Sequence, residues 1–199
     1  MALFLVAAST AGAQIVSDMT PVTIREAIAM GTKAKDLGWY RIQEKARFTW
    51  PPLIALYTTP FLRVALAANN AKKHYKVFTE ADVTHEMLAP EIQVLVPSQW
   101  ADGGAIANVE TIVLLPHNSK DASQAIHPAQ TKDPPEEYKD IPGFPGGGKS
   151  LIAIFPIAVW KEGNDVRVVF DRAIPGAMGP KALGGCTDCK ARLYLDKVR

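Results

Sequence analysis

The two cysteines of the chain, Cys186 and Cys189, are the residues whose type and spacing suggest chemistry most directly. A Cys-x-x-Cys pair can exchange disulfides, supply half of a zinc site or close a short structural disulfide. A structural zinc site takes four ligands, and the sequence has no second cysteine pair. A thioredoxin-like pair begins a helix, whereas this pair precedes an expected strand. We therefore predict a Cys186–Cys189 disulfide, with thiol–disulfide exchange through the same two residues as the alternative.

Residues 143–150 read Gly-Phe-Pro-Gly-Gly-Gly-Lys-Ser and match the pattern of a nucleotide-binding P-loop. Such a loop binds phosphate because a strand leads into it and the amides at the start of a following helix face the anion. Here a polar segment with Pro142 precedes the loop, and residues 151–156 favour a strand. Pro145 also lacks the amide hydrogen that a phosphate would need. We therefore interpret the segment as a glycine-rich turn into a strand and predict no cofactor.

The histidines and acidic residues form no recognisable catalytic pattern. The sequence contains no Gly-x-Ser-x-Gly elbow, and the pair His85-Glu86 lacks the second histidine of a zinc protease helix. The other histidines are widely separated, at His74, His117 and His127. We predict no catalytic and no metal-binding residues. A hydrolase whose residues come together only in the folded chain stays open as a second alternative.

Basic and acidic residues are mixed along the whole chain. The 22 basic and 20 acidic residues give a formal net charge of +2, without the basic stripe that binds nucleic acid. The densest basic run, residues 72–76, reads Lys-Lys-His-Tyr-Lys. This run could contact phosphate, but it is more typical of the solvated end of a helix. We therefore expect a protein or another envelope component as the partner, and no nucleic acid.

The first thirteen residues have the features of a secretory signal peptide. Residues 2–8 form a short apolar run, and Ala11-Gly12-Ala13 before Gln14 has the small-x-small form of a cleavage site. No Lys or Arg precedes the run, which departs from the usual pattern. The run is too short to cross a bilayer as a helix, so we expect no membrane span. These features predict export to the periplasm or the extracellular space.

Two threonine-proline pairs open the expected helices. Thr20-Pro21 places a capping residue before a preorganised first position. Apolar residues at helical spacing follow, and Gly38 stands where a left-handed residue would end the helix. Thr59-Pro60 repeats this chemistry before the alanine-rich stretch 61–74. A third, short helical turn is expected at 79–82.

Beyond residue 90 the apolar period changes to two, which is typical of strands. Turn residues at 162–165 predict a hairpin between the strands on either side of them. The segment 116–149 is polar and rich in Pro and Gly, so it is expected to be a long loop. The expected strands are 92–96, 109–115, 151–160, 166–170 and 191–195.

Aromatic residues crowd the region from Trp39 to Tyr57, with Trp100 and Trp160 elsewhere. An exposed cluster would offer a binding platform, because aromatic surface supplies contact area at low entropic cost. A buried cluster that fixes the N-terminal segment to the sheet is the interpretation that we favour.

The composition fits one domain, with 199 residues, 48% of them hydrophobic. Fifteen prolines and fourteen glycines favour many turns over a helical bundle. We predict a mainly β (α+β) fold with an antiparallel β-sandwich-like core and one or two N-terminal α-helices. The expected organisation is a signal peptide at 1–13, a helical segment packed on the core at 14–90 and a sandwich-like region at 91–199, the last two forming a single domain. The sequence thus predicts an exported, non-enzymatic protein that acts by surface binding or as a structural component of the envelope or extracellular space.

Overall fold

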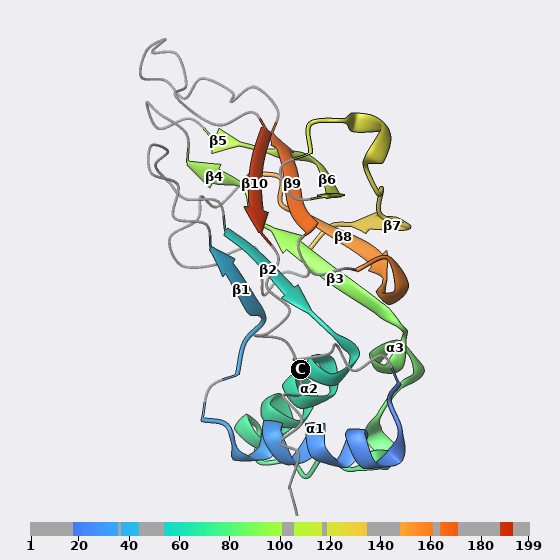
Figure 1. Ribbon diagram of the computed structural model, residues 1–199. Coiled ribbons are helices and arrows are strands. Elements are labelled where there is room, and N and C mark those ends of the chain that lie inside the picture. Colours follow the sequence, from blue (N-terminus) through green and yellow to red (C-terminus); the bar gives the residue numbers. More distant parts are fainter. Residues whose placement is uncertain are drawn as a thin grey trace, which may run out of the picture.

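The computed structural model describes residues 18–35, 37–43, 54–100, 106–116, 119–134, 148–160, 164–170 and 188–192. Within these ranges the chain is a mixed α+β protein with antiparallel sheets (Figure 1). The α-helices are α1 (Pro21–Lys33), α2 (Pro60–Lys73) and α3 (His85–Leu88), and the 3-10 helices are η1 (Glu80–Asp82), η3 (Ala122–Gln124) and η5 (Ile157–Val159). The strands are β1 (Tyr40–Gln43), β2 (Ile54–Thr58), β3 (Glu91–Val96), β4 (Gln99–Trp100), β5 (Ile106–Ala107), β6 (Val109–Pro116), β7 (Gln130–Lys132), β8 (Leu151–Pro156), β9 (Asn164–Phe170) and β10 (Asp188–Arg192).

The strands of the described residues form two main sheets. The larger has five strands in the order β1-β2-β3-β8-β7, and the smaller has three in the order β10-β9-β6. Every pairing in both sheets is antiparallel. A separate two-stranded ribbon joins β4 to β5. The expected segment 14–90 therefore contributes strands as well as helices, because β2 is a direct neighbour of β3 across the boundary at residue 90.

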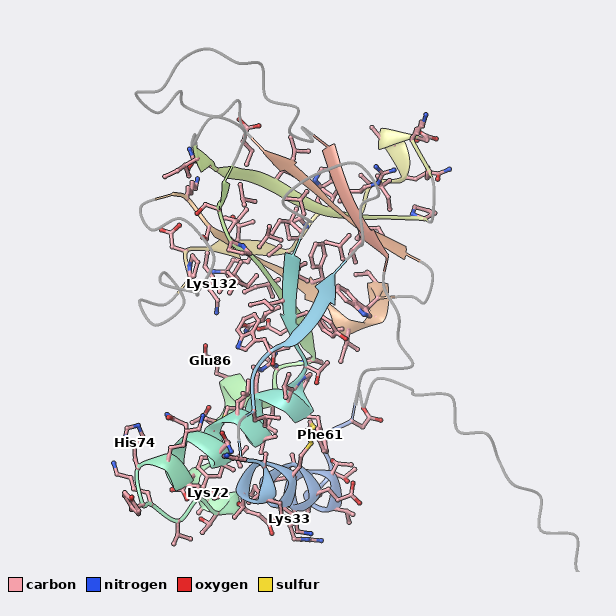
Figure 2. All side chains as sticks on the ribbon, turned by 90° about the vertical axis from the view of Figure 1, so that its left-hand side faces the viewer. Lys33, Phe61, Lys72, His74, Glu86 and Lys132 are labelled. Carbon is pink, nitrogen blue, oxygen red and sulfur yellow. The ribbon has the colours of Figure 1, made fainter. Side chains whose placement is uncertain are left out.

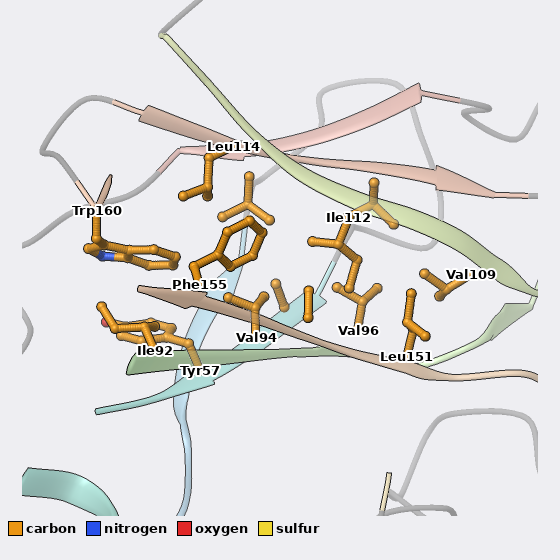
Figure 3. Packing of buried hydrophobic residues seen from close by; sticks show 14 residues of the cluster. Tyr57, Ile92, Val94, Val96, Val109, Ile112, Leu114, Leu151, Phe155 and Trp160 are labelled. Carbon is orange, nitrogen blue, oxygen red and sulfur yellow. The ribbon is translucent and has the colours of Figure 1, made fainter. Parts of the chain in front are cut away.

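One hydrophobic core is shared by the two main sheets (Figure 3). The alternate residues Ile92, Val94 and Val96 of β3 project into it, as the period of two predicted. The smaller sheet supplies side chains from β6 and β9 to the same cluster. The buried members are Ala55, Tyr57, Ile92, Val94, Val96, Val109, Ile112, Leu114, Leu151, Ala153, Phe155, Trp160, Val166 and Val168.

The other face of the five-stranded sheet is also buried at its centre. Leu95 of β3 and Ile152 of β8 are 0% and 1% exposed, and they cluster with Ile154. Leu56 and Trp39 pack against this group. Strands buried on both faces read as nearly continuous apolar runs, which is what residues 151–155 show.

The expected hairpin across residues 162–165 is wrong. β8 pairs with β3 and β7, whereas β9 pairs with β6 and β10, so the two strands belong to different sheets. After β8, Pro156 ends the strand and the chain turns through η5 to the buried Trp160. Both strands still face the shared core, and each finds its partners far away in sequence.

The expected long loop at 116–149 contains regular structure. β7 adds an edge strand to β8, η3 forms a single turn, and Ile126 makes a bridge to Leu114. Of the expected last strand at 191–195, residues 191 and 192 belong to β10, which begins at Asp188, and residues 193–195 lie outside the described residues.

Both threonine-proline pairs open helices, as predicted. The Thr20 hydroxyl accepts a hydrogen bond from the Thr23 amide at 3.3 Å, and that of Thr59 accepts one from the Leu62 amide at 3.2 Å. The expected left-handed end at Gly38 is wrong, since α1 ends at Lys33 and its extended cap residue is Ala34. Side chains of α2 complete this end instead.

Candidate functional site

The helices lie together at one end of the five-stranded sheet (Figure 1). This position follows from the connection, because α2, η1 and α3 all lie between β2 and β3. We call residues 18–35 and 60–90 the helical layer. Its own small core joins Ala27 of α1 to Phe61, Val64 and Ala65 of α2.

Close approach of the two long helices depends on Gly31. A methyl group at this position would lie 2.0 Å from the carbonyl oxygen of Ala65 and 3.0 Å from the Cβ of Ala68. The backbone of α1 therefore rests directly on α2, and only glycine fits at the contact. This contact sets how closely α1 approaches α2 within the helical layer.

The end of α1 is completed by polar side chains from α2. The buried amide of Asn69 donates hydrogen bonds of 2.9 Å to the carbonyl oxygens of Gly31 and Ala34. The Lys72 ammonium donates a third, of 3.2 Å, to Ala34. Helix-end carbonyls without partners must be capped or solvated, and here the neighbouring helix caps them. The carboxyl-terminal ends of α1 and α2 are thereby held side by side.

Arg63 joins α2 to the chain that leads into β3. Its guanidinium donates to the carbonyl oxygens of Met87 at 3.2 Å and Glu91 at 3.1 Å, and also to that of Ala89. Burial lowers the pKa of Arg63, while the charges of Glu91 and Glu86 act in the opposite direction. This arginine positions the helical layer on the sheet.

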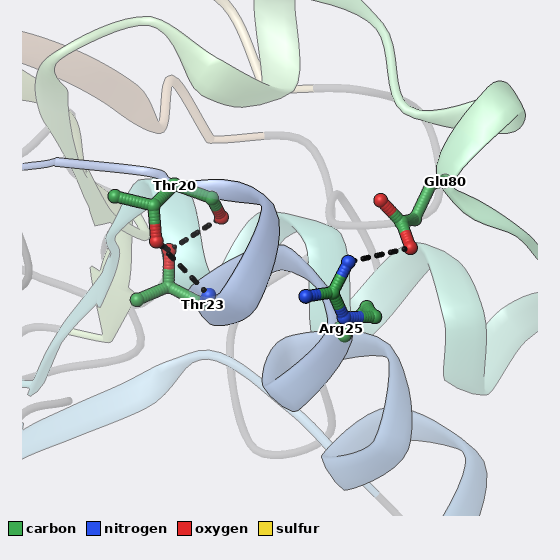
Figure 4. A network of polar contacts seen from close by, with 4 residues as sticks. All are labelled: Thr20, Thr23, Arg25 and Glu80. Carbon is green, nitrogen blue, oxygen red and sulfur yellow. Dashed lines mark hydrogen bonds and ion pairs between the residues drawn. The ribbon is translucent and has the colours of Figure 1, made fainter.

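An open cavity of about 460 Å³ lies between the exposed side of α1 and the start of η1. Ile28 and Ala29 supply apolar surface, and Arg25 and Glu80 form an ion pair of 3.3 Å at the cavity (Figure 4). Both charged side chains are about half exposed, so the pair contributes little to stability and stays accessible to a ligand. The full lining is Arg25, Ile28, Ala29, Thr32, Lys33, Thr79 and Glu80.

The turn that carries Glu80 is held by a capping box. The Asp82 carboxylate accepts hydrogen bonds from the Thr79 amide at 2.8 Å and from the Thr79 hydroxyl at 2.9 Å. These bonds lower the pKa of Asp82 below its ordinary value. The helical turn expected at 79–82 is thus confirmed, and it places Glu80 opposite Arg25.

The segment 72–77, which we call the α2 corner, is exposed at every residue. Tyr75 has a φ of 57°, and its side chain is 100% exposed. Val77 is 87% exposed. Figure 2 places Lys33, Lys72 and His74 at the end of the molecule away from the sheets. The expectation of a solvated, basic helix end is confirmed, and the exposed apolar side chains are an addition to it.

The P-loop-like segment leads into a strand. Residues 143–147 lie outside the described residues, and β8 begins at Leu151, directly after Ser150. The Lys149 amide donates a 2.7 Å hydrogen bond to the side-chain oxygen of Asn108, and the Lys149 carbonyl accepts one of 2.9 Å from Val109. These hydrogen bonds join the start of β8 to the start of β6. The expected strand after Ser150 is confirmed, while the glycine-rich turn lies mostly outside the described residues.

The cysteine prediction stays a prediction. Cys186 lies outside the described residues, and Cys189 is the second residue of β10, opposite Val168. A bridge between the two cysteines would have to close across Thr187 and Asp188, at the point where β10 begins.

Apart from the exposed Tyr75, several aromatic residues of the described ranges serve packing. Tyr57 and Phe155 each have ring centroids 6.2 Å from that of Trp160, inside the shared core. Trp39 packs against the opposite face of the larger sheet. Of the expected cluster, Tyr57 is buried and Trp39 is partly buried, but the two lie on opposite faces of the larger sheet and do not form one cluster. Phe48 and Trp50 lie outside the described ranges.

The structure does not bring the histidines together. His74 caps α2, His85 begins α3 and His127 follows Ile126, and all three are exposed; His117 lies outside the described residues. Among the residues with a described placement, no three His, Cys, Asp or Glu side chains gather as metal ligands would.

The described helices are too short or too polar to cross a bilayer.

Sequence reasoning missed the cavity, because Arg25 and Glu80 are 55 positions apart. The sequence contains only a weak indication of the exposed Tyr75: a helix that ends in lysines is followed by an aromatic residue where glycine is usual.

Comparisons with protein-family models, curated proteins and solved structures found no match.

Proposed function

We propose that the chain is an exported, non-enzymatic protein of the cell envelope or extracellular space that binds a partner through its helical layer. In this proposal the two sheets form a sandwich-like scaffold that holds the layer at one end. Export rests on the signal-peptide features of residues 1–13, which predict a mature chain that begins at Gln14.

The distribution of exposed apolar side chains is the observation that carries this proposal. Among the described residues, the large hydrophobic side chains exposed to solvent are Val22, Tyr75 and Val77, and all three belong to the helical layer. Single exposed apolar residues are ordinary on any surface, but their restriction to one layer, together with an open cavity, favours an interaction surface.

The cavity favours an apolar group with a negative charge beside it. Ile28 and Ala29 would contact the apolar group, and the rim already carries the Arg25–Glu80 pair. The Lys33 ammonium has no ion-pair partner among the described residues, so it is free to attract a carboxylate. A partner segment with an apolar side chain next to an acidic one matches this chemistry.

The test is position-specific photocrosslinking in the native host. A photoreactive amino acid replaces Ala29 in the cavity, and a matched variant carries it at Glu110, an exposed position on β6. The proposal predicts a discrete crosslinked adduct in the envelope or secreted fraction for position 29 and none for position 110. Equal crosslinking at both positions, or none at position 29, would contradict it.

A further inference from the structure

The α2 corner ends its helix with a conformation that suits glycine better than tyrosine. The Lys76 amide donates to the Ala71 carbonyl at 2.8 Å, and the Tyr75 amide donates to the Lys72 carbonyl at 3.0 Å. This pair of bonds defines a Schellman motif, whose left-handed position is usually glycine. Tyr75 occupies that position at an energetic cost, and its ring gains no contact within the protein in return. Folding alone therefore does not explain the tyrosine.

The surroundings of Tyr75 are basic. The corner itself contributes Lys72, Lys73, His74 and Lys76, and it contains no acidic residue. The end of α1 adds Lys33 and Lys35, because Asn69 and Lys72 hold it against α2. Some of these lysines complement the negative ends of the two helices. That role leaves the exposed Tyr75 and Val77 unexplained.

The acidic groups that follow the corner in sequence are already engaged, whereas Asp36, next to Lys35, lies outside the described residues. The Glu80 carboxylate pairs with Arg25, and that of Asp82 accepts two hydrogen bonds from Thr79. The end of the helical layer therefore combines one aromatic and one aliphatic side chain in water with a set of cations around them.

We propose that the α2 corner binds the anionic surface of a phospholipid bilayer. Tyrosine is suited to the boundary between head groups and acyl chains, and lysines next to an anionic membrane strengthen binding by roughly fivefold each. Lys72 and His74 of the corner lie at the end of the molecule away from the sheets, so the sheets do not obstruct its approach to a continuous surface (Figure 2). The cavity, in contrast, lies between α1 and η1 and suits a partner side chain. This inference rests on the proposed binding role of the helical layer and names a second contact for it.

Vesicle sedimentation of the intact chain tests the proposal. Vesicles of phosphatidylcholine with one third phosphatidylglycerol should bind the protein, at least tenfold more strongly than vesicles of phosphatidylcholine alone. Added salt should weaken the binding. Equal binding to the two kinds of vesicle, or none to either, would overturn the proposal.

Three variants locate the contact. Tyr75→Gly should fold at least as stably as the parent, because glycine suits the left-handed backbone, yet bind vesicles several-fold more weakly. Lys76→Gln should weaken binding roughly fivefold. Lys120→Gln, an exposed lysine outside the helical layer, is the matched control and should bind as the parent does. Parent-like binding by both Tyr75→Gly and Lys76→Gln would overturn the proposal.

A final measurement separates a bilayer from a free anion. Millimolar inorganic phosphate should not raise the melting temperature of the protein. A phosphate-dependent increase in melting temperature that Lys76→Gln removes would show that the corner binds a soluble anion, and it would refute the proposal of a bilayer as its ligand. Because the photocrosslinker at Ala29 reports on the cavity, failure of vesicle binding with an intact crosslink would refute this inference and leave the proposed function standing.

Discussion

Substitution of Gly31 by alanine tests the close contact between α1 and α2. In a solvated helix this change stabilises by about 0.5–1 kcal/mol, because alanine loses less conformational entropy than glycine on folding. At Gly31 the new methyl group would lie 2.0 Å from the Ala65 carbonyl oxygen, which is main chain and cannot rotate away. The helices must separate, and overpacking of this kind costs about 1–3 kcal/mol.

Because the 2.0 Å approach is to main chain, the overpacking cost should lie in the upper part of that range, at about 2–3 kcal/mol. The net expectation for Gly31→Ala is then a destabilisation of about 1–2 kcal/mol, after a gain of about 1 kcal/mol in helix propensity is subtracted. For a chain of this length that corresponds to a fall in melting temperature of about 2–8 °C. Urea unfolding followed by circular dichroism, with a thermal scan beside it, measures both quantities.

Gly38→Ala is the matched control for this prediction. A methyl group at Gly38 meets nothing within 4 Å, so the variant should be neutral or stabilised by up to about 1 kcal/mol. If Gly31→Ala proves as stable as the parent, or more stable, then the helices are not in the contact described and the reasoning is refuted.

Three further predictions concern Arg63, Asp82 and the cysteines. Arg63→Met should destabilise the protein by on the order of 2–4 kcal/mol, because three carbonyl oxygens lose a charged donor. The free energy of unfolding of Arg63→Lys, measured in urea, should lie between those of Arg63→Met and the parent. Equal stability of all three proteins would contradict the assigned role. Because the hydrogen bonds from Thr79 lower the folded pKa of Asp82, its contribution to stability is full above the ordinary aspartate pKa of about 3.9 and is lost as the pH falls through the folded pKa. Asp82→Asn should therefore be less stable than the parent at neutral pH and converge with it in acid, and a gap independent of pH in the unfolding curves would refute this. If Cys186 and Cys189 form a structural disulfide, mass spectrometry after alkylation should find no labelled thiol until a reductant is added, whereas labelling of the untreated protein would refute the bridge.

The sequence predicted those parts of the fold that depend on neighbouring residues. The helix starts follow from a threonine side chain and a proline ring, which act within one turn of the chain. The strand after Ser150 follows from the β-branched and apolar residues 151–155. The capped turn at 79–82 follows in the same way from Thr79 and its spacing to Asp82.

The failures all involve partners that are distant in sequence. Turn residues at 162–165 favoured a hairpin, but the choice of partner for β8 and β9 is made by the shared core. Gly38 was expected to end α1, whereas Asn69 and Lys72 of the other helix complete that end. No local pattern encodes such contacts, and the cavity between α1 and η1 was missed for the same reason.

Hydroxyl-radical labelling of the protein in living cells of its native host tests most directly whether the helical layer is the binding surface. Tyr75 and His127 are both exposed and reactive, and they lie in the helical layer and beside the sheets respectively. Relative to the purified protein, Tyr75 should be labelled several-fold less in cells, while labelling of His127 stays unchanged. Equal labelling of Tyr75 in both settings, or protection of His127 to the same extent, would contradict the account.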